Sequence, residues 1–189
     1  MTAVPAMRSP RRYDPERKSR IVDATIAVIA EHGVAGTTMR RIAAAADVPL
    51  GSLTYHFDGV DDLLARAFER HAERMSPRYE ACFDGVRDTA DLVDAVTELI
   101  NGDAGGDAAD WTVAYELYLA ALRNPALRRV TDSWMLRSRN VLERFVDPVT
   151  ARGVDALIEG LVMHTTLSTR TYDRAETRAI VARILGVAP

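Results

Sequence analysis

The amino-acid sequence predicts an all-α protein of about nine helices. Along most of its 189 residues, apolar side chains recur at intervals of three and four, which collects them on one face of a helix. Residues that favour helix ends separate these segments, with aspartate, asparagine or threonine before a helix and glycine after it. Hydrophobic residues make up 48% of the chain, which is enough to form a globular core.

The first predicted helix covers residues 15–32. Asp14 can cap its N terminus, Pro15 suits its first position, and Gly33 can end it in a left-handed conformation. One stripe of residues on this helix is expected to be buried, namely Ile21, Ala24, Thr25, Val28 and Ile29. This helix would support the two short helices that follow it.

Residues 37–57 predict two short helices joined by a tight turn. Thr37 or Thr38 can cap the first of them, and Pro49 begins the second. The turn falls at Asp47-Val48, where Asp47 is expected in a left-handed conformation. The apolar side of this pair consists of Ile42, Ala43, Ala46, Val48, Leu53 and Phe57. A bihelical unit of this shape can lay its second helix in the major groove of DNA.

The distribution of charge agrees weakly with a DNA-facing N-terminal end. The whole chain has a net charge of −3, but eight basic and five acidic residues precede Phe57, so this part has a charge of +3 and the remainder −6. Residues 1–13 contain three arginines and two prolines without apolar periodicity, which predicts a flexible basic arm. The arm either reaches DNA or is a solubilising tail.

Several segments between Gly33 and Leu64 have a specific spacing. They are Gly33, Thr37-Thr38-Met39-Arg40-Arg41-Ile42-Ala43, Ala46-Asp47-Val48, Gly51-Ser52-Leu53-Thr54-Tyr55-His56-Phe57 and Leu63-Leu64. Residues 15–64 thereby resemble the DNA-binding domain of the TetR (tetracycline-repressor) family. The resemblance implies a helix-turn-helix domain whose DNA contacts come from Thr38, Arg40, Arg41, Leu50, Gly51, Ser52, Thr54, Tyr55 and His56. Leu50, Gly51, Ser52 and Thr54 would face base edges, and the others would lie at phosphates.

Three positions depart from the family pattern. Asp47 stands where the family usually has glycine, Thr54 where it has tyrosine, and Val60 where it has lysine. Since the tyrosine and lysine normally contact phosphates, phosphate binding is predicted to depend more on the N-terminal arm and on Thr38, Arg40, Arg41 and His56. Removing residues 1–12 should then lower the slope of log affinity against log salt by about 0.9 per lost contact.

The remaining chain predicts six further helices. The first, residues 61–78, has His71 within its apolar stripe, where a core histidine is expected rather than a ligand. The others are predicted at residues 89–100, 108–123, 125–145, 150–169 and 173–185, with a flexible connector over 101–110. The connector resembles a calcium loop only superficially, because the spacing and the final glutamate are wrong.

Aromatic residues gather on two of these helices. Trp111, Tyr115 and Tyr118 form a stripe on one helix, and Trp134 follows on the next. Such a stripe can be plain core, but buried polar tips need partners, which a ligand could supply. The candidate ligand-binding residues are Trp111, Tyr115, Tyr118, Trp134, Arg137, Leu161 and His164, of which His164 could instead face a dimer interface.

The last two predicted helices are apolar over a wider surface than one neighbouring helix can cover. The family resemblance implies that they form a four-helix dimer interface with a second subunit, with Leu157, Leu161, Ile180 and Ile184 as the contact residues. A monomeric bundle is the alternative.

These observations predict a flexible arm over residues 1–13, a helix-turn-helix DNA-binding domain over 14–59, and a helical ligand-binding and dimerisation domain over 60–189. No G-x-S-x-G, H-E-x-x-H or phosphate-binding glycine loop is present, so we expect neither an enzyme nor a cofactor or metal. The single cysteine, Cys82, excludes an internal disulfide, and no apolar run approaches the ~20 residues of a membrane span.

The predicted protein is a cytoplasmic, homodimeric transcriptional regulator, most simply a repressor that binds a palindromic operator in double-stranded DNA. A small-molecule inducer of unknown identity would release it. The alternative is a DNA-binding dimer without such an inducer, which is regulated by protein partners or acts constitutively.

Overall fold

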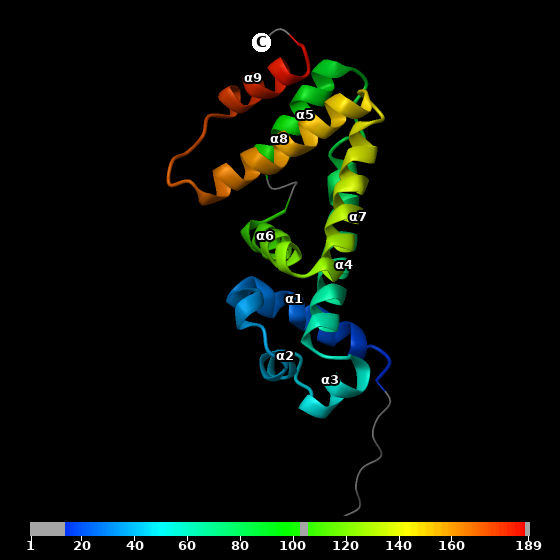
Figure 1. Cartoon of the computed structure of the whole chain (residues 1–189). Helices are drawn as coiled ribbons and strands as arrows, with labels where there is room; N and C mark the ends of the chain where they lie inside the picture. Colours follow the sequence, from blue (N-terminus) through cyan, green and yellow to red (C-terminus); the bar gives the residue numbers. More distant parts are fainter. Residues whose placement is uncertain (1–13, 103–105, 188–189) are drawn as a thin grey trace, which may run out of the picture.

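A computed structural model describes residues 14–102 and 106–187, and within these ranges the chain forms nine α-helices and no strands (Figure 1). The predicted all-α fold is therefore confirmed. The arm over residues 1–13 lies outside the described residues, as do positions 103–105 of the predicted connector. None of the described helices is both long enough and apolar enough to cross a membrane.

The three N-terminal helices form one end of the molecule. They are α1 (Arg17–Gly36), α2 (Met39–Ala45) and α3 (Leu50–His56). Their shared core consists of Ile21, Val22, Ile42, Ala43, Ala46, Leu53, Phe57 and Leu63. Thr38 is the N-cap of α2, and Asp47 in the turn before α3 has a φ of 51°. Both features were predicted, and the helix-turn-helix is confirmed.

The long helix α4 (Val60–Ala81) leads from this end to the rest of the molecule (Figure 1). It packs against α1 on one side and against α7 (Pro125–Leu142) on the other. A second apolar cluster joins α1 and α4 to α6 (Ala108–Arg123) and α7. Its buried members are Ile26, Ile29, Leu64, Ala67, Phe68, Val113, Leu117, Ala121, Leu127 and Val130. The N-terminal end of the molecule therefore packs against α6 as well as against α4.

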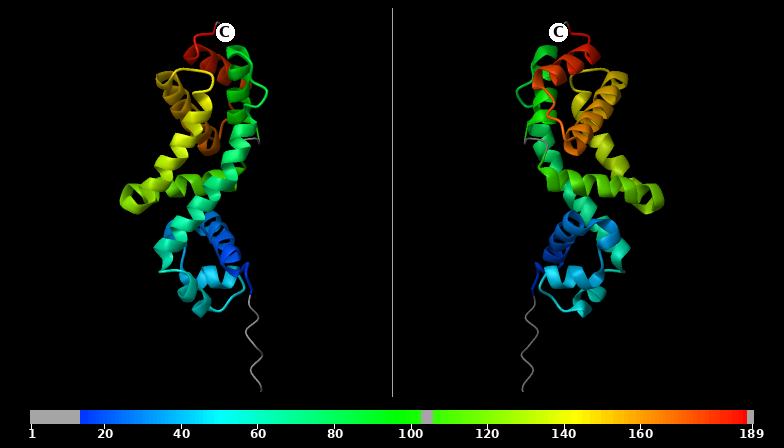
Figure 2. Two further views of the ribbon diagram at one scale, coloured as in Figure 1. Left: turned by 90° about the vertical axis from the view of Figure 1, so that its right-hand side faces the viewer. Right: turned by 90° about the vertical axis from the view of Figure 1, so that its left-hand side faces the viewer.

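The far end contains α5 (Thr89–Asn101), α8 (Pro148–Leu167) and α9 (Arg174–Ile184), which pack on one another. Their cluster includes Phe83, Leu92, Val96, Val154 and Ile158. The two side views in Figure 2 show α6 running across the molecule between α1 and these upper helices. Helix α6 therefore contacts the N-terminal helix α1 on one side and faces the upper helices on the other.

Several helix ends differ from the predictions by a few residues, among them the ends of α4 at Ala81 and of α7 at Leu142. The N-cap of α1 is Glu16 and not Asp14, because Asp14 begins a preceding turn in which its Oδ1 accepts the Glu16 N–H at 3.2 Å. Gly33 has the predicted positive φ of 66°, but helix resumes beyond this kink and ends at Gly36. Asp147 caps α8 with Pro148 next to it, so this helix begins earlier than residue 150.

Candidate functional site

The surface of α3 combines exposed polar and apolar groups. Leu53 is fully buried and anchors the helix, whereas Leu50 is 43% exposed and Tyr55 82% exposed. Thr54 is exposed beside them, and its hydroxyl donates to the Gly51 carbonyl at 3.2 Å. A Cβ at Gly51 would meet no protein atom within 4 Å, so internal packing does not require glycine there. The exposed side of α3 is therefore open to an external partner.

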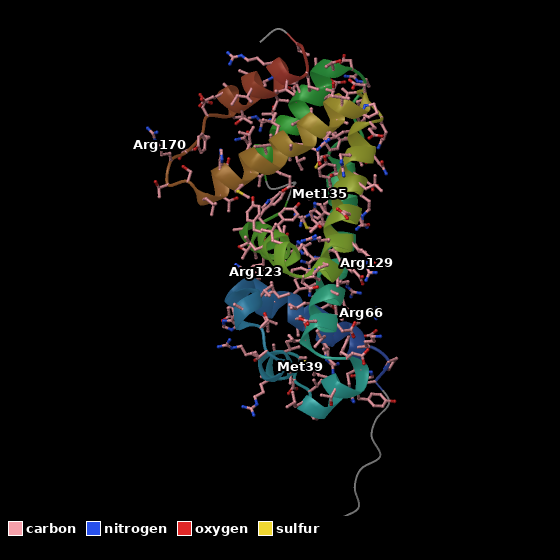
Figure 3. The ribbon with its side chains drawn as sticks, in the orientation of Figure 1. Met39, Arg66, Arg123, Arg129, Met135 and Arg170 are labelled. Carbon is pink, nitrogen blue, oxygen red and sulfur yellow. The ribbon has the colours of Figure 1, made fainter. Side chains whose placement is uncertain are left out.

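The start of α2 presents polar groups next to α3. The Thr38 hydroxyl oxygen accepts the Arg41 backbone N–H at 3.3 Å, which leaves the hydroxyl proton free to donate elsewhere. The Arg41 guanidinium donates to the Gly36 carbonyl, while Arg40 is exposed to solvent. Ser52 and His56 are only half-exposed, and the His56 ring meets the Tyr55 ring edge-on at 4.8 Å. The predicted DNA contacts thus share one end of the molecule, where Figure 3 labels Met39 of α2.

A pocket opens among the helices above α1. Its empty space is about 560 Å³, part of which is open solvent. It is lined by Met75, Ser76, Tyr79 and Glu80 of α4, Leu99 of α5, Trp111 of α6, Trp134, Arg137, Ser138 and Val141 of α7, and Asp155, Ile158 and Glu159 of α8. Met135, which follows Trp134 along α7, marks this region in Figure 3.

The pocket includes three of the predicted ligand-binding residues, Trp111, Trp134 and Arg137. Tyr118 is not part of the lining, but its hydroxyl donates to Glu159 Oε1 at 2.8 Å. The remaining candidates Tyr115, Leu161 and His164 are also absent from the lining, and His164 is exposed on α8. Burial raises the pKa of Tyr115 to about 12.

Two partly buried acidic residues of the pocket were missed by sequence reasoning. Asp155 and Glu159 lie one turn apart on α8, beside the buried residues Val154 and Ile158. Burial raises the pKa of both carboxyls, and the Ser138 hydroxyl opposes this for Asp155 by donating to it at 2.5 Å. Their position at the edge of the apolar stripe of α8 was the one available signal in the sequence. Which other helices would enclose them could not be predicted from the sequence.

His71 lies next to the pocket and is a core residue, as predicted. It is 1% exposed and stacks on Trp134 with ring centroids 6.0 Å apart. Neither ring nitrogen has a hydrogen-bond partner, and the nearest carboxylate contact is from Nδ1 to Asp110 at 3.9 Å. Burial lowers the pKa of His71, which favours the neutral ring. Within residues 14–102 and 106–187, no group of three or more His, Cys, Asp or Glu side chains could hold a metal ion.

Polar contacts join α6, which lines part of the pocket, to α1 and α4. Glu116 Oε2 accepts the Val34 backbone N–H of α1 at 2.7 Å. Asp110, at the start of α6, binds Arg74 and Arg78 of α4 at 3.0 Å each. Trp111 of the pocket lining follows Asp110 directly, so one helix contacts the pocket, α1 and α4.

Comparisons with known proteins agree with this architecture. Residues 21–67 match the model of the bacterial regulatory proteins of the tetR family, and residues 87–187 match that of the tetracyclin repressor-like C-terminal domain. The structure is similar to a transcriptional regulator, SCO7518, from Streptomyces coelicolor A3(2), with 41% identity, a TM-score of 0.83, and coverage of 90% of this chain and 99% of the other.

Two further relatives match most of the chain. The multidrug binding protein EbrR, solved with imidazole, has 39% identity and a TM-score of 0.75, over 93% of this chain and 98% of EbrR. The regulator BetI 2 from Chromohalobacter salexigens is 27% identical over 178 residues, which cover 87% of this chain and 84% of BetI 2. The chain belongs to the TetR family of helix-turn-helix, DNA-binding transcriptional regulators.

Proposed function

We propose that this protein is a homodimeric repressor that binds a palindromic operator and is released by a small molecule in the pocket. The exposed face of α3 beside the start of α2 is the observation that carries the DNA-binding half. The two copies of α3 in the dimer would enter successive major grooves about one helical turn apart, ~34–36 Å. A regulator that binds chromosomal DNA acts in the compartment that contains the chromosome, so we assign this protein to the cytoplasm.

The proposed dimer uses α8 and α9, with the DNA-binding unit over residues 14–59 and the regulatory unit over 60–189. Apolar side chains on the outer surface of these two helices support this assignment, since Met163 is 37%, Leu167 73% and Ile184 50% exposed. Of the four predicted interface residues, Leu157, Leu161 and Ile180 are half-buried within their own chain, and Ile184 is the most exposed.

The small-molecule half is supported by the pocket and by a relative. Structures of EbrR, 38% identical to this chain, have been determined with proflavin, ethidium and malachite green. The pocket here is narrow, so an organic ligand has to move its walls apart. Because α6 carries both a pocket wall and the Glu116 contact to α1, that movement would reposition the DNA-binding ends. The ligand lowers operator affinity only to the extent that it binds the displaced arrangement more tightly than the original one.

The operator can be identified by selecting bound sequences from random double-stranded DNA and sequencing them. We expect a palindrome whose half-sites are one helical turn apart, bound by two protein chains. Selection of a single unpaired half-site would contradict the dimeric mode. An organic ligand that saturates the pocket and leaves operator affinity unchanged would contradict the release mechanism and favour a regulator without an inducer.

A further inference from the structure

We propose that the pocket selects an organic cation with an aromatic body, which Glu159 and Asp155 attract and the indoles of Trp111 and Trp134 flank. This inference rests on the proposed function, because it specifies the chemistry of the molecule that the pocket would hold. It concerns the sign of the ligand's charge, which the family assignment leaves open.

Unpaired polar atoms collect at this pocket. Tyr79 Oη, Arg137 Nε and Glu159 Oε2 are buried and have no hydrogen-bond partner, and all three residues line the pocket. Buried polar groups in folded proteins are nearly always paired, because leaving one unpaired costs free energy. Three such atoms around one cavity indicate a site whose remaining partner is a ligand.

The charge of the pocket favours a positive ligand. Glu159 Oε1 accepts from Tyr118, and the Trp134 side chain also favours the ionised carboxyl, but Oε2 has no partner in hydrogen-bonding geometry. Asp155 lies one turn away, and its nearest cation is Arg139 at 4.0 Å. Burial raises the pKa of both carboxyls, and a bound cation would favour their ionised forms. The pocket's own cation, Arg137, forms no ion pair with either carboxylate among the described residues.

The rest of the lining suits a flat, apolar body. One face of the Trp134 ring is covered by His71, whose plane is tilted from it by only 6°, so a ligand would meet the other face. Trp111 is only partly buried and stacks on Tyr115 with centroids 6.0 Å apart. Indole faces attract organic cations, with a stronger effect away from water. A Ca²⁺ or Mg²⁺ ion is disfavoured, because it takes six or more oxygen ligands.

The test uses three probes of similar size on the purified full-length protein without DNA. N-methylacridinium is a permanent cation, acridine is uncharged above neutral pH, and acridine carboxylate is an anion; binding is followed by fluorescence. We expect the cation to bind about tenfold more tightly than acridine, and the anion to bind least. Glu159→Gln keeps an acceptor for Tyr118, so the variant should fold while losing about 10- to 100-fold in cation affinity. Its affinity for acridine should change little.

Glu73→Gln is the matched control, because Glu73 also lies on α4 but is exposed to solvent and is not part of the pocket lining. Its cation affinity should stay within about twofold of the wild type, since solvent screens exposed charges. Equal binding of all three probes, or tighter binding of the anion, would overturn the cation proposal and leave the pocket as an effector site. If no probe binds, the cation proposal fails together with the small-molecule half of the proposed function, while operator selection tests the DNA-binding half separately.

Discussion

Glu116 on α6 illustrates how one side chain can connect two parts of this molecule. The kink at Gly33 releases the Val34 backbone N–H from the α1 hydrogen-bond pattern, and Glu116 Oε2 accepts it at 2.7 Å. A Cβ at Gly33 would lie 3.0 Å from Glu116 Oε1, so the positive φ and the close approach both favour glycine. The contact is local in space but spans 82 positions of the chain.

Replacing Glu116 with alanine should destabilise the protein by about 1–2 kcal/mol, because the Val34 N–H loses its acceptor. Glu116→Gln keeps an acceptor oxygen in the same place, so this variant should lose clearly less stability than Glu116→Ala. Urea unfolding of the two variants beside the wild type measures the difference. Unfolding midpoints that match the wild type for both variants would show that this contact contributes nothing.

The buried carboxyls of α8 predict an unusual dependence of stability on pH. The pKa of Glu159 lies above its ordinary 4.5 when folded, so the folded state keeps this proton longer than the unfolded chain does. Stability should therefore fall as pH rises from about 4.5 through the raised pKa, and level off above it. The groups that face Glu159 are Tyr79 of α4, Tyr115 and Tyr118 of α6, Trp134 of α7 and Asp155 of α8.

Glu159→Gln removes one of these two acids, so the variant should lose less stability than the wild type across this pH window. Urea unfolding at a series of pH values measures this loss of stability. The control Glu80→Gln is expected to follow the wild type, because Glu80 is exposed. If Glu159→Gln shows the same pH profile as the wild type, the carboxyl of Glu159 is not the titrating group.

At the scale of the elements, the turn between α2 and α3 is one place where this chain departs from its family pattern. Asp47 is the one non-glycine residue among those described with a positive φ. Aspartate tolerates this conformation better than most residues, but a Cβ there still costs energy. The departure was visible in the sequence, and the backbone adopts the turn nevertheless, because the cores of α2 and α3 hold it.

Asp47→Gly should therefore stabilise the protein, by up to about 1 kcal/mol after the greater flexibility of unfolded glycine is counted. The thermal midpoint should rise accordingly. Asp47→Ala is the control and should fall below the wild type, because alanine keeps the Cβ and lacks the polar side chain. A glycine variant that is less stable than the alanine variant would contradict this account.

At the scale of the whole molecule, dimerisation is the property with the sharpest mutational test. Ile184→Glu places a charge on the exposed outer side of α9, where the proposed dimer would bury it at a high cost. We expect the variant to sediment as a monomer at concentrations where the wild type is a dimer, and to bind the operator more weakly. Leu122→Glu on α6, 73% exposed in the structure, should remain dimeric. An unchanged dimer in Ile184→Glu would exclude this side of α9 as the interface.

The sequence by itself determined the helices and the DNA-binding unit. Helix periodicity, caps and turn residues act between neighbours in the chain, so Thr38, Asp47 and the stripe on α4 could be predicted without any knowledge of packing. The errors at Asp14 and Gly33 concern single turns, where several ways of ending a helix have similar energies.

Only the tertiary structure decided which side chains share the pocket. Trp111, Trp134 and Arg137 were predicted for it, whereas Asp155, Glu159 and Tyr79 were not. Their roles depend on how α4, α6, α7 and α8 cross, and this arrangement is set by packing between residues far apart in sequence. The acidic groups of the pocket include Asp155 and Glu159 of α8. In the sequence, this helix is recognisable only by its stripe of apolar residues.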